Sequence, residues 1–105
     1  MIAELGELLT LEEPIRTPDA GGGAVIAWSP VDTVWAAIRP RSGSETAIGD
    51  RRVARVTHEI WLRARAPVTP AMRFVLGDRL FAIEAVLQAG ARRQWLKCLC
   101  REELL

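Results

Sequence analysis

The sequence predicts an all-β protein, a small antiparallel β-barrel of about six strands in a single domain, residues 1–105. Apolar and polar residues alternate with a period of two through most of the chain, which is the pattern of half-buried antiparallel strands. Short runs rich in glycine and proline separate these stretches, as turns separate strands. A chain of 105 residues can bury one modest core. A two-sheet sandwich satisfies the same pattern, but a closed barrel leaves no sheet edge exposed.

Two strands are expected in the N-terminal part. Residues 7–16 alternate as a strand does, and residues 17–24 contain three consecutive glycines, which predict a loop. Residues 32–40 alternate too, and Pro40 is expected to end that strand because it cannot donate a ladder hydrogen bond.

The clearest alternation lies in residues 54–65, which predict a long strand with one apolar and one polar face. The apolar face holds Ala54, Val56, His58, Ile60, Leu62 and Ala64. The polar face holds Arg55, Thr57, Glu59, Trp61, Arg63 and Arg65. His58 is therefore interpreted as a buried or rim histidine with its hydrogen bonds satisfied, rather than as a catalytic base.

Three more strands are expected toward the C-terminus. Residues 72–88 divide into two strands around Gly77 and Asp78, a pair that suits a two-residue hairpin turn. A turn at 88–93 leads to a last strand at 94–102.

Residues 41–52 lack the alternation of a strand. They are expected to form a long loop, with a short helical turn over 44–47 that Ser42 or Ser44 would cap. Loops of this length between two strands are usually functional or mobile.

Cys98 and Cys100, the two cysteines of the chain, share a predicted strand face with Leu96. Zinc needs about four ligands, and the one histidine, His58, lies far upstream. A disulfide between neighbours i and i+2 would strain the strand. Because free cysteine packs as a small hydrophobe, we expect two buried, inert thiols and no metal site.

Composition excludes several classes of function. The net charge is +1, so no global field favours nucleic acid or an anionic membrane. No apolar run is long enough to span a membrane, and the acidic N-terminus lacks the features of a signal peptide, so a cytosolic setting is expected. No nucleophile elbow, zinc-binding HExxH, P-loop or dinucleotide motif occurs in the required context, and we predict neither an enzyme nor a cofactor.

Arginine is concentrated around residues 41–52. The arginines here are Arg39, Arg41, Arg51, Arg52 and Arg55, against the acids Glu45 and Asp50. They form either an ordinary solvated rim or a local positive surface that meets phosphate backbones without reading sequence. Trp61, which alternates with arginines on the polar face of its strand, has the composition of an exposed interface anchor.

Eight short motifs follow one another from about Leu5 to Glu103. They comprise Asp19, Gly21 and Gly22; Trp28; Thr33 to Ala36; Pro40, Ser42, Gly43 and Glu45; Thr57, His58, Ile60, Arg63 and Arg65; Val68 to Arg73; Gly77, Arg79, Phe81 and Ile83; and Trp95, Leu96, Cys100 and Glu102. Their order resembles the phage head–tail adaptor family, the head-completion or stopper proteins of long-tailed phages, prophages and gene transfer agents. One departure is that acidic and apolar residues follow Gly6, where the family often has a basic stretch.

The resemblance implies a structural protein without catalysis or cofactor, present in the virion at the head–tail junction and in the bacterial cytoplasm before assembly. Its copies would form a sixfold or twelvefold ring beneath the portal and its adaptor, close the filled head and receive the tail terminator or tail tube protein. The long loop would project toward the channel of packaged double-stranded DNA, with the candidate residues Arg41, Ser42, Gly43, Ser44, Glu45, Asp50, Arg51 and Arg52. Candidate ring or partner contacts are Trp61, Arg63, Arg65, Leu104 and Leu105, although terminal fraying is an equal interpretation of the last two.

An alternative function is a small-barrel module that binds single-stranded nucleic acid without sequence preference. That function needs aromatic platforms along a basic groove. Trp61 with Arg63 and Arg65 supplies part of this, but the chain has only four tryptophans, two phenylalanines and no tyrosine.

Overall fold

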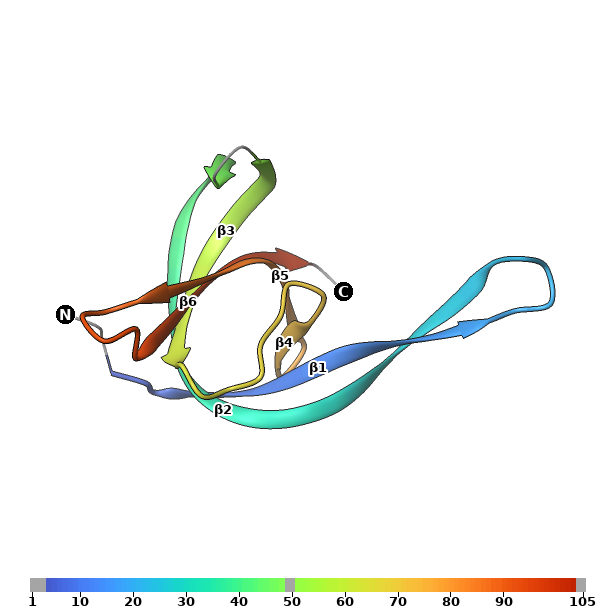
Figure 1. Ribbon diagram of the computed structural model, residues 1–105, viewed down its shortest axis with the longest axis horizontal. Coiled ribbons are helices and arrows are strands. Elements are labelled where there is room, and N and C mark those ends of the chain that lie inside the picture. Colours follow the sequence, from blue (N-terminus) through green and yellow to red (C-terminus); the bar gives the residue numbers. More distant parts are fainter. Residues whose placement is uncertain (1–3, 49–50, 104–105) are drawn as a thin grey trace.

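A computed structural model describes the backbone of residues 4–48 and 51–103, and the side chains of 4–41 and 56–103. Its strands are β1 (Glu7–Pro18), β2 (Ala24–Ile48), β3 (Arg51–Arg63), β4 (Arg73–Leu76), β5 (Arg79–Ala89) and β6 (Trp95–Glu103). They form a closed barrel in the order β1-β2-β3-β6-β5-β4, and every pairing is antiparallel (Figure 1). The predicted all-β barrel of about six strands is confirmed.

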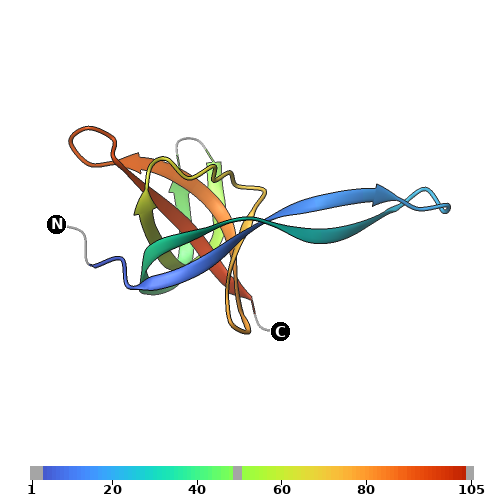
Figure 2. The same ribbon diagram turned by 90° about the horizontal axis from the view of Figure 1, so that it is seen from below.

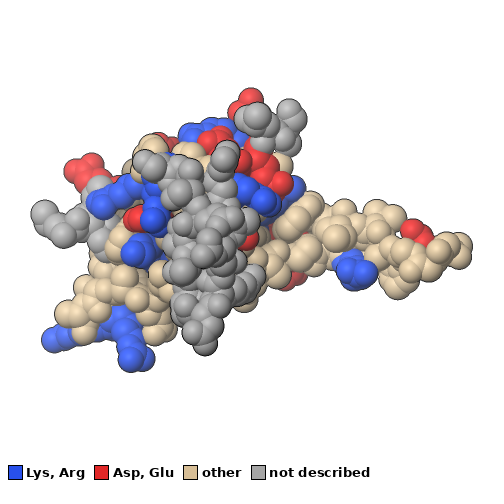
Figure 3. Space-filling model, turned by 90° about the horizontal axis from the view of Figure 1, so that it is seen from above, with Lys and Arg blue, Asp and Glu red and all other residues tan. Residues whose placement is uncertain are grey.

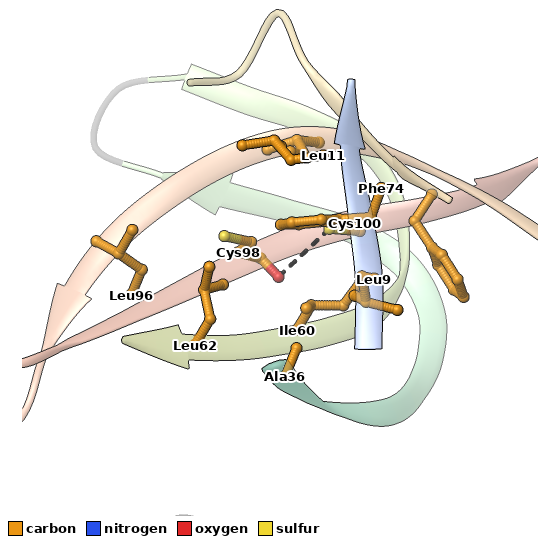
Figure 4. Packing of buried hydrophobic residues seen from close by; sticks show 11 residues of the cluster. Leu9, Leu11, Ala36, Ile60, Leu62, Phe74, Leu96, Cys98 and Cys100 are labelled. Atoms are coloured by element: carbon orange, nitrogen blue, oxygen red, sulfur yellow. Dashed lines mark hydrogen bonds between the residues drawn. The ribbon is translucent and has the colours of Figure 1, made fainter. Parts of the chain in front are cut away.

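The core fills the inside of the barrel with side chains from all six strands (Figure 4). Its buried members are Leu9, Leu11, Ala36, Ile60, Leu62, Phe74, Phe81, Ile83, Leu96, Cys98 and Cys100. Much of the alternation predicted for β3 and β6 is confirmed in this core, where Ile60 pairs with Cys98 and Leu62 pairs with Leu96. Val56, which was predicted for the same face, instead packs with Ala85 and Leu99 in a second, smaller cluster. The connection 64–72 also packs Val68 and Met72 against it.

The predicted hairpin turn at Gly77 and Asp78 is confirmed, and joins β4 to β5. Gly77 has a φ of 61°, in the left-handed region that such a turn needs and glycine tolerates. A second turn, within the predicted segment 88–93, joins β5 to β6.

The β1–β2 ribbon extends well beyond the barrel (Figures 1 and 2). We call its projecting part, residues 13–29, the arm; the arm makes the molecule 50 Å long but only 30 and 26 Å across. The tip lies in the predicted glycine loop. There the Asp19 carboxylate accepts hydrogen bonds from the N–H groups of Gly21 (2.9 Å) and Gly23 (3.0 Å), which close the turn.

The predicted loop or helical turn at 41–52 was wrong. β2 continues past Pro40 as far as Ile48, and β3 begins at Arg51, so this segment belongs to a β2–β3 hairpin. The register is irregular between Pro40 and Ser44 and again between Ser44 and Thr46. Such bulges destroy the period-two pattern, and a bulge next to Pro40 also accommodates its missing N–H.

Candidate partner interface

Three tryptophans lie on the outer surface of β2, β3 and β6, opposite the core. Ala36 pairs with Leu62 and both are buried in the core, so the next residues, Trp35 and Arg63, lie on the outer side, where both line the same cleft. Arg63 in turn pairs with Trp95, and Trp61 pairs with Lys97. We call this surface the tryptophan face and define it as Trp35, Trp61 and Trp95 with the cations Arg39, Arg63 and Lys97.

Trp61 is half-buried within the tryptophan face, although the sequence predicted an exposed side chain. The Arg39 guanidinium and the Lys97 ammonium lie 5.8 Å and 5.5 Å from its ring centroid. The indole N–H donates a 3.1 Å hydrogen bond to Glu59, whose other carboxylate oxygen lies 3.5 Å from Arg41. These contacts fix the orientation of the ring and leave part of its surface available for association.

Trp35 is the most open tryptophan of this face, with 56% of its surface exposed. It lies opposite Leu8 of β1, which is 47% exposed. Trp95 is partly covered by Arg63, whose guanidinium lies 4.6 Å from the ring centroid. Trp35 was not among the site residues predicted from the sequence, although the alternation of residues 32–40 already placed it on the face opposite Ala36.

A cleft of about 350 Å³ opens where β3 separates from β2. Its lining residues are Leu5, Asp32, Thr33, Val34, Trp35, Leu62, Arg63, Arg65 and Ala66. Two predicted contact residues, Arg63 and Arg65, therefore meet Trp35 at this cleft, whereas Trp61 lies outside it.

His58, Arg79 and Glu102 form an ionic cluster at one end of the barrel. Arg79 donates two hydrogen bonds to Glu102, of 2.8 and 3.0 Å, and this contact lowers the pKa of the Glu102 carboxyl. His58 Nδ1 lies 2.9 Å from the Thr57 hydroxyl, and its ring meets Phe81 edge-on at 5.2 Å. Burial lowers the pKa of His58, partly offset by Glu102, 3.7 Å away. Hydrogen bonds thus join Arg79 to Glu102 and His58 to Thr57, as expected of a structural cluster.

Cys98 and Cys100 are fully buried, as predicted (Figure 4). Burial raises the pKa of the Cys98 thiol to about 12 and that of Cys100 also well above its ordinary value. A thiol held protonated is a poor nucleophile and a poor metal ligand. In the described part of the chain, no group of three or more His, Cys, Asp or Glu side chains is arranged to hold a metal ion.

The predicted channel residues are distributed along the β2–β3 hairpin. The backbones of Ser42, Gly43, Ser44 and Glu45 lie in β2, and those of Arg51 and Arg52 lie in β3. Arg41 is exposed at the base of the hairpin. Asp50, Leu104 and Leu105 lie outside the described residues. Over 4–48 and 51–103, no helix is long and apolar enough to cross a membrane.

Fold and surface together define a small β-barrel protein whose distinctive features are two projecting hairpins and an aromatic outer face. The model of the phage head completion protein family matches residues 1–103, and the chain belongs to this family. It thus stands among the structural proteins of phage-type heads, and the resemblance found in its motifs is confirmed.

Two solved structures are similar to the chain over nearly its whole length. One is a chain of the virion of a native gene transfer agent particle, with 34% sequence identity, a TM-score of 0.74 and coverage of 99% of this chain and 100% of that one. The other is a protein of Shigella flexneri 2a studied in solution, with 26% identity, a TM-score of 0.69 and coverage of 96% and 95%. No curated protein matches the chain significantly.

Proposed function

We propose that this protein is the stopper of a head–tail connector, which closes a filled head and docks the tail. Copies would form a ring below the portal or its adaptor, retain the packaged double-stranded DNA and present a surface to a tail terminator or tail tube protein. The observation that carries the proposal is the end-to-end similarity, at 34% identity, to a chain of a gene transfer agent virion.

A closed ring requires two different surfaces on each copy, one of which binds the other on the next copy. This chain has candidates in separate places: the arm and the tryptophan face. Before assembly, the protein would remain a monomer in the bacterial cytoplasm and join others only on the assembled particle.

The β2–β3 hairpin is the element that we assign to the DNA channel. It leaves the barrel in a different direction from the arm (Figure 1), so one hairpin can line a channel while the other contacts neighbours. Arg41, Arg51 and Arg52 would supply weak attraction to the phosphate backbone, which Glu45 and Asp50 temper. Weak attraction suits a channel that must also release its DNA.

Electron microscopy of purified particles tests this function. Particles from cells that express a tagged chain should carry the tag in a collar between capsid and tail. Cells without the gene should accumulate tailless heads that lose their DNA. Normal tailed particles from the deletion strain, or particles that never contain the chain, would refute the proposal.

The tryptophan face also requires a test of single-stranded nucleic-acid binding, the alternative function. A binding groove needs several open rings on which successive bases stack. Here Arg63 lies over Trp95, and Arg39 and Lys97 lie over Trp61, so only Trp35 is largely open. We therefore expect no measurable affinity for free oligonucleotides at physiological salt; clear binding would favour the alternative.

A further inference from the structure

The large apolar side chains that the described residues expose fall into two groups. Ile15, Val25 and Ile26 lie on the arm, and Leu8, Val31 and Trp35 lie on the barrel or at its junction with the arm. Val25 is 60% and Ile26 is 54% exposed, although β-branched residues are usually covered in a sheet. Two separate exposed apolar surfaces on one chain indicate that each surface contacts another molecule in the assembled state.

The arm is an unusual element to find uncovered. A two-stranded ribbon without a layer against it is only marginally stable in water. The arm is also nearly uncharged, since Glu13, Arg16 and Asp19 are its only ionisable residues. Figure 3 shows this contrast: charged side chains gather over the barrel, and the arm is mostly free of them.

The two edges of the arm differ in chemistry. Proline has no N–H, so Pro14 and Pro18 cannot donate to β2; their pairs with Trp28 and Ala24 must be the non-hydrogen-bonded pairs of the ribbon. The backbone N–H and C=O groups of residues in such pairs point away from the partner strand, toward the outer edge of the ribbon. The β1 edge is thus blocked at two positions, whereas the β2 edge from Ala24 to Trp28 has no proline and no charge. Natural edges that must stay single usually carry such blocks.

The cleft beside Trp35 offers a surface that complements this edge. β2 pairs with β3 only from Ala36 onward, so its edge at 32–35 is also unpaired, and Trp35 and Leu62 give the cleft apolar walls. Its volume of about 350 Å³ exceeds the ~150 Å³ cavity that holds a benzene molecule, so aliphatic side chains such as Val25 and Ile26 fit. The arm spans about 20 Å from base to tip, comparable to the 26 Å width of the molecule, and so reaches across one neighbour.

We propose that the arm of each copy occupies the cleft of the next copy in the ring. This inference rests on the function proposed above and deepens it, because it names the two surfaces that join neighbours. The arm points away from its own barrel (Figure 2), so it docks on another copy. Each copy then gives one arm and receives one, which is the heterologous arrangement that closes a ring.

Thiol cross-linking in assembled particles tests the contact. Cys98 and Cys100 are fully buried, so a maleimide reagent reacts only with introduced cysteines. Copies with Ile26→Cys and copies with Trp35→Cys, each with a different tag, are co-expressed, and the particles are treated with a short bismaleimide. We expect a covalent dimer that carries both tags, and none from particles that contain either variant alone.

Each other outcome is informative. Linkage of Ile26→Cys to itself, linkage to another virion protein, or no linked dimer in particles that hold both variants would overturn the arm-in-cleft contact and leave the stopper function standing. Particles that lack the chain altogether would overturn the proposed function and this inference with it.

Charge substitution gives a second, independent measurement. Ile26→Asp and Trp35→Asp lie outside the core, so both variants should keep the wild-type circular dichroism and melting curve. Each should reduce incorporation into particles roughly tenfold or more, since one buried charge removes at least about one decade of affinity. Gln88→Asp, on exposed β5 surface, is the matched control and should assemble normally. Normal incorporation of both arm and cleft variants would refute the contact.

Discussion

Arg73 of β4 stacks on Trp28 where the arm leaves the barrel, with its guanidinium 4.2 Å from the centroid of the indole ring. Its Nε also donates a 2.7 Å hydrogen bond to Glu12 of β1. One side chain of the barrel thus holds residues of both arm strands. The direction of the arm is therefore fixed by the barrel, although no other described strand packs against the arm along its length.

Arg73→Ala should loosen the arm without unfolding the barrel. The change removes a cation–π contact and a charged hydrogen bond in a partly buried site, which together stabilise by about 2 kcal/mol. Native-state hydrogen exchange measured by NMR should show faster exchange at Val25 and Thr17, which are paired within the arm, and little change at Ile60. Arg16→Ala, on the exposed arm surface, is the control. Equal exchange in the two variants would show that Arg73 does not anchor the arm.

The barrel was predictable because its core follows local alternation. Leu9, Leu11, Ile60 and Leu62 occupy positions that a period of two places on one face, and the turn at Gly77 has a distinctive residue pair. Such signals are contained within a few neighbouring residues, so one sequence is enough to reveal them.

The hairpins were harder to predict for two different physical reasons. In the β2–β3 hairpin, bulges after Pro40 interrupt the alternation, so a strand looked like a loop. In the arm, the strands were partly recognised, but alternation cannot tell whether another layer covers a strand. Alternation placed Trp35 on the outer face, but its position at a cleft depends on where β3 separates from β2, which is a property of the whole sheet.

Trp61→Ala should leave a folded protein that fails to join heads. The ring is half-buried on the outer face and does not belong to the core, so its loss should cost little stability. Particle assembly in a strain that lacks the wild-type gene, followed by electron microscopy, measures the effect. Trp61→Phe keeps an aromatic surface but loses the hydrogen bond to Glu59, and should assemble better than the alanine variant. Normal head joining by Trp61→Ala would refute the assignment.

The two thiols should be unreactive in the folded protein. Ellman's reagent at pH 8 should detect neither cysteine in buffer and both in denaturant, because burial keeps Cys98 and Cys100 protonated and inaccessible. The pKa of Cys98 is raised from 9.0 to about 12, so the unfolded thiol ionises at a lower pH than the folded one. The free energy of unfolding should therefore fall as the pH rises from 9 toward 12. Rapid labelling of the native protein would contradict this account.

Acid should weaken the fold in two steps. Burial lowers the pKa of His58 in the folded protein below 6.5, its ordinary value. Between pH 6.5 and the folded pKa, the unfolded state therefore binds more protons than the folded state, and the free energy of unfolding falls as the pH falls. The hydrogen bonds from Arg79 lower the pKa of Glu102 from 4.5, which adds a second loss below that pH. Urea unfolding at pH 8, 5.5 and 4 measures both steps. His58→Gln should abolish the first step and keep the second. If the free energy of unfolding of this variant depends on pH above 4.5 as it does in the wild type, His58 is excluded as the cause.

The arginines of the β2–β3 hairpin should govern DNA retention if this hairpin lines the channel. Reversal of both Arg51 and Arg52 to glutamate replaces attraction to the phosphate backbone with repulsion, repeated in every copy of a ring. Filled heads with this variant should release DNA to added nuclease several-fold faster than wild-type heads, and the difference should shrink at high salt because counterions screen the charges. Reversal of Arg92 and Arg93, in the turn between β5 and β6, makes the same change of charge elsewhere and should retain DNA normally. Equal rates of DNA release from the two double variants would refute the assignment of the β2–β3 hairpin to the channel.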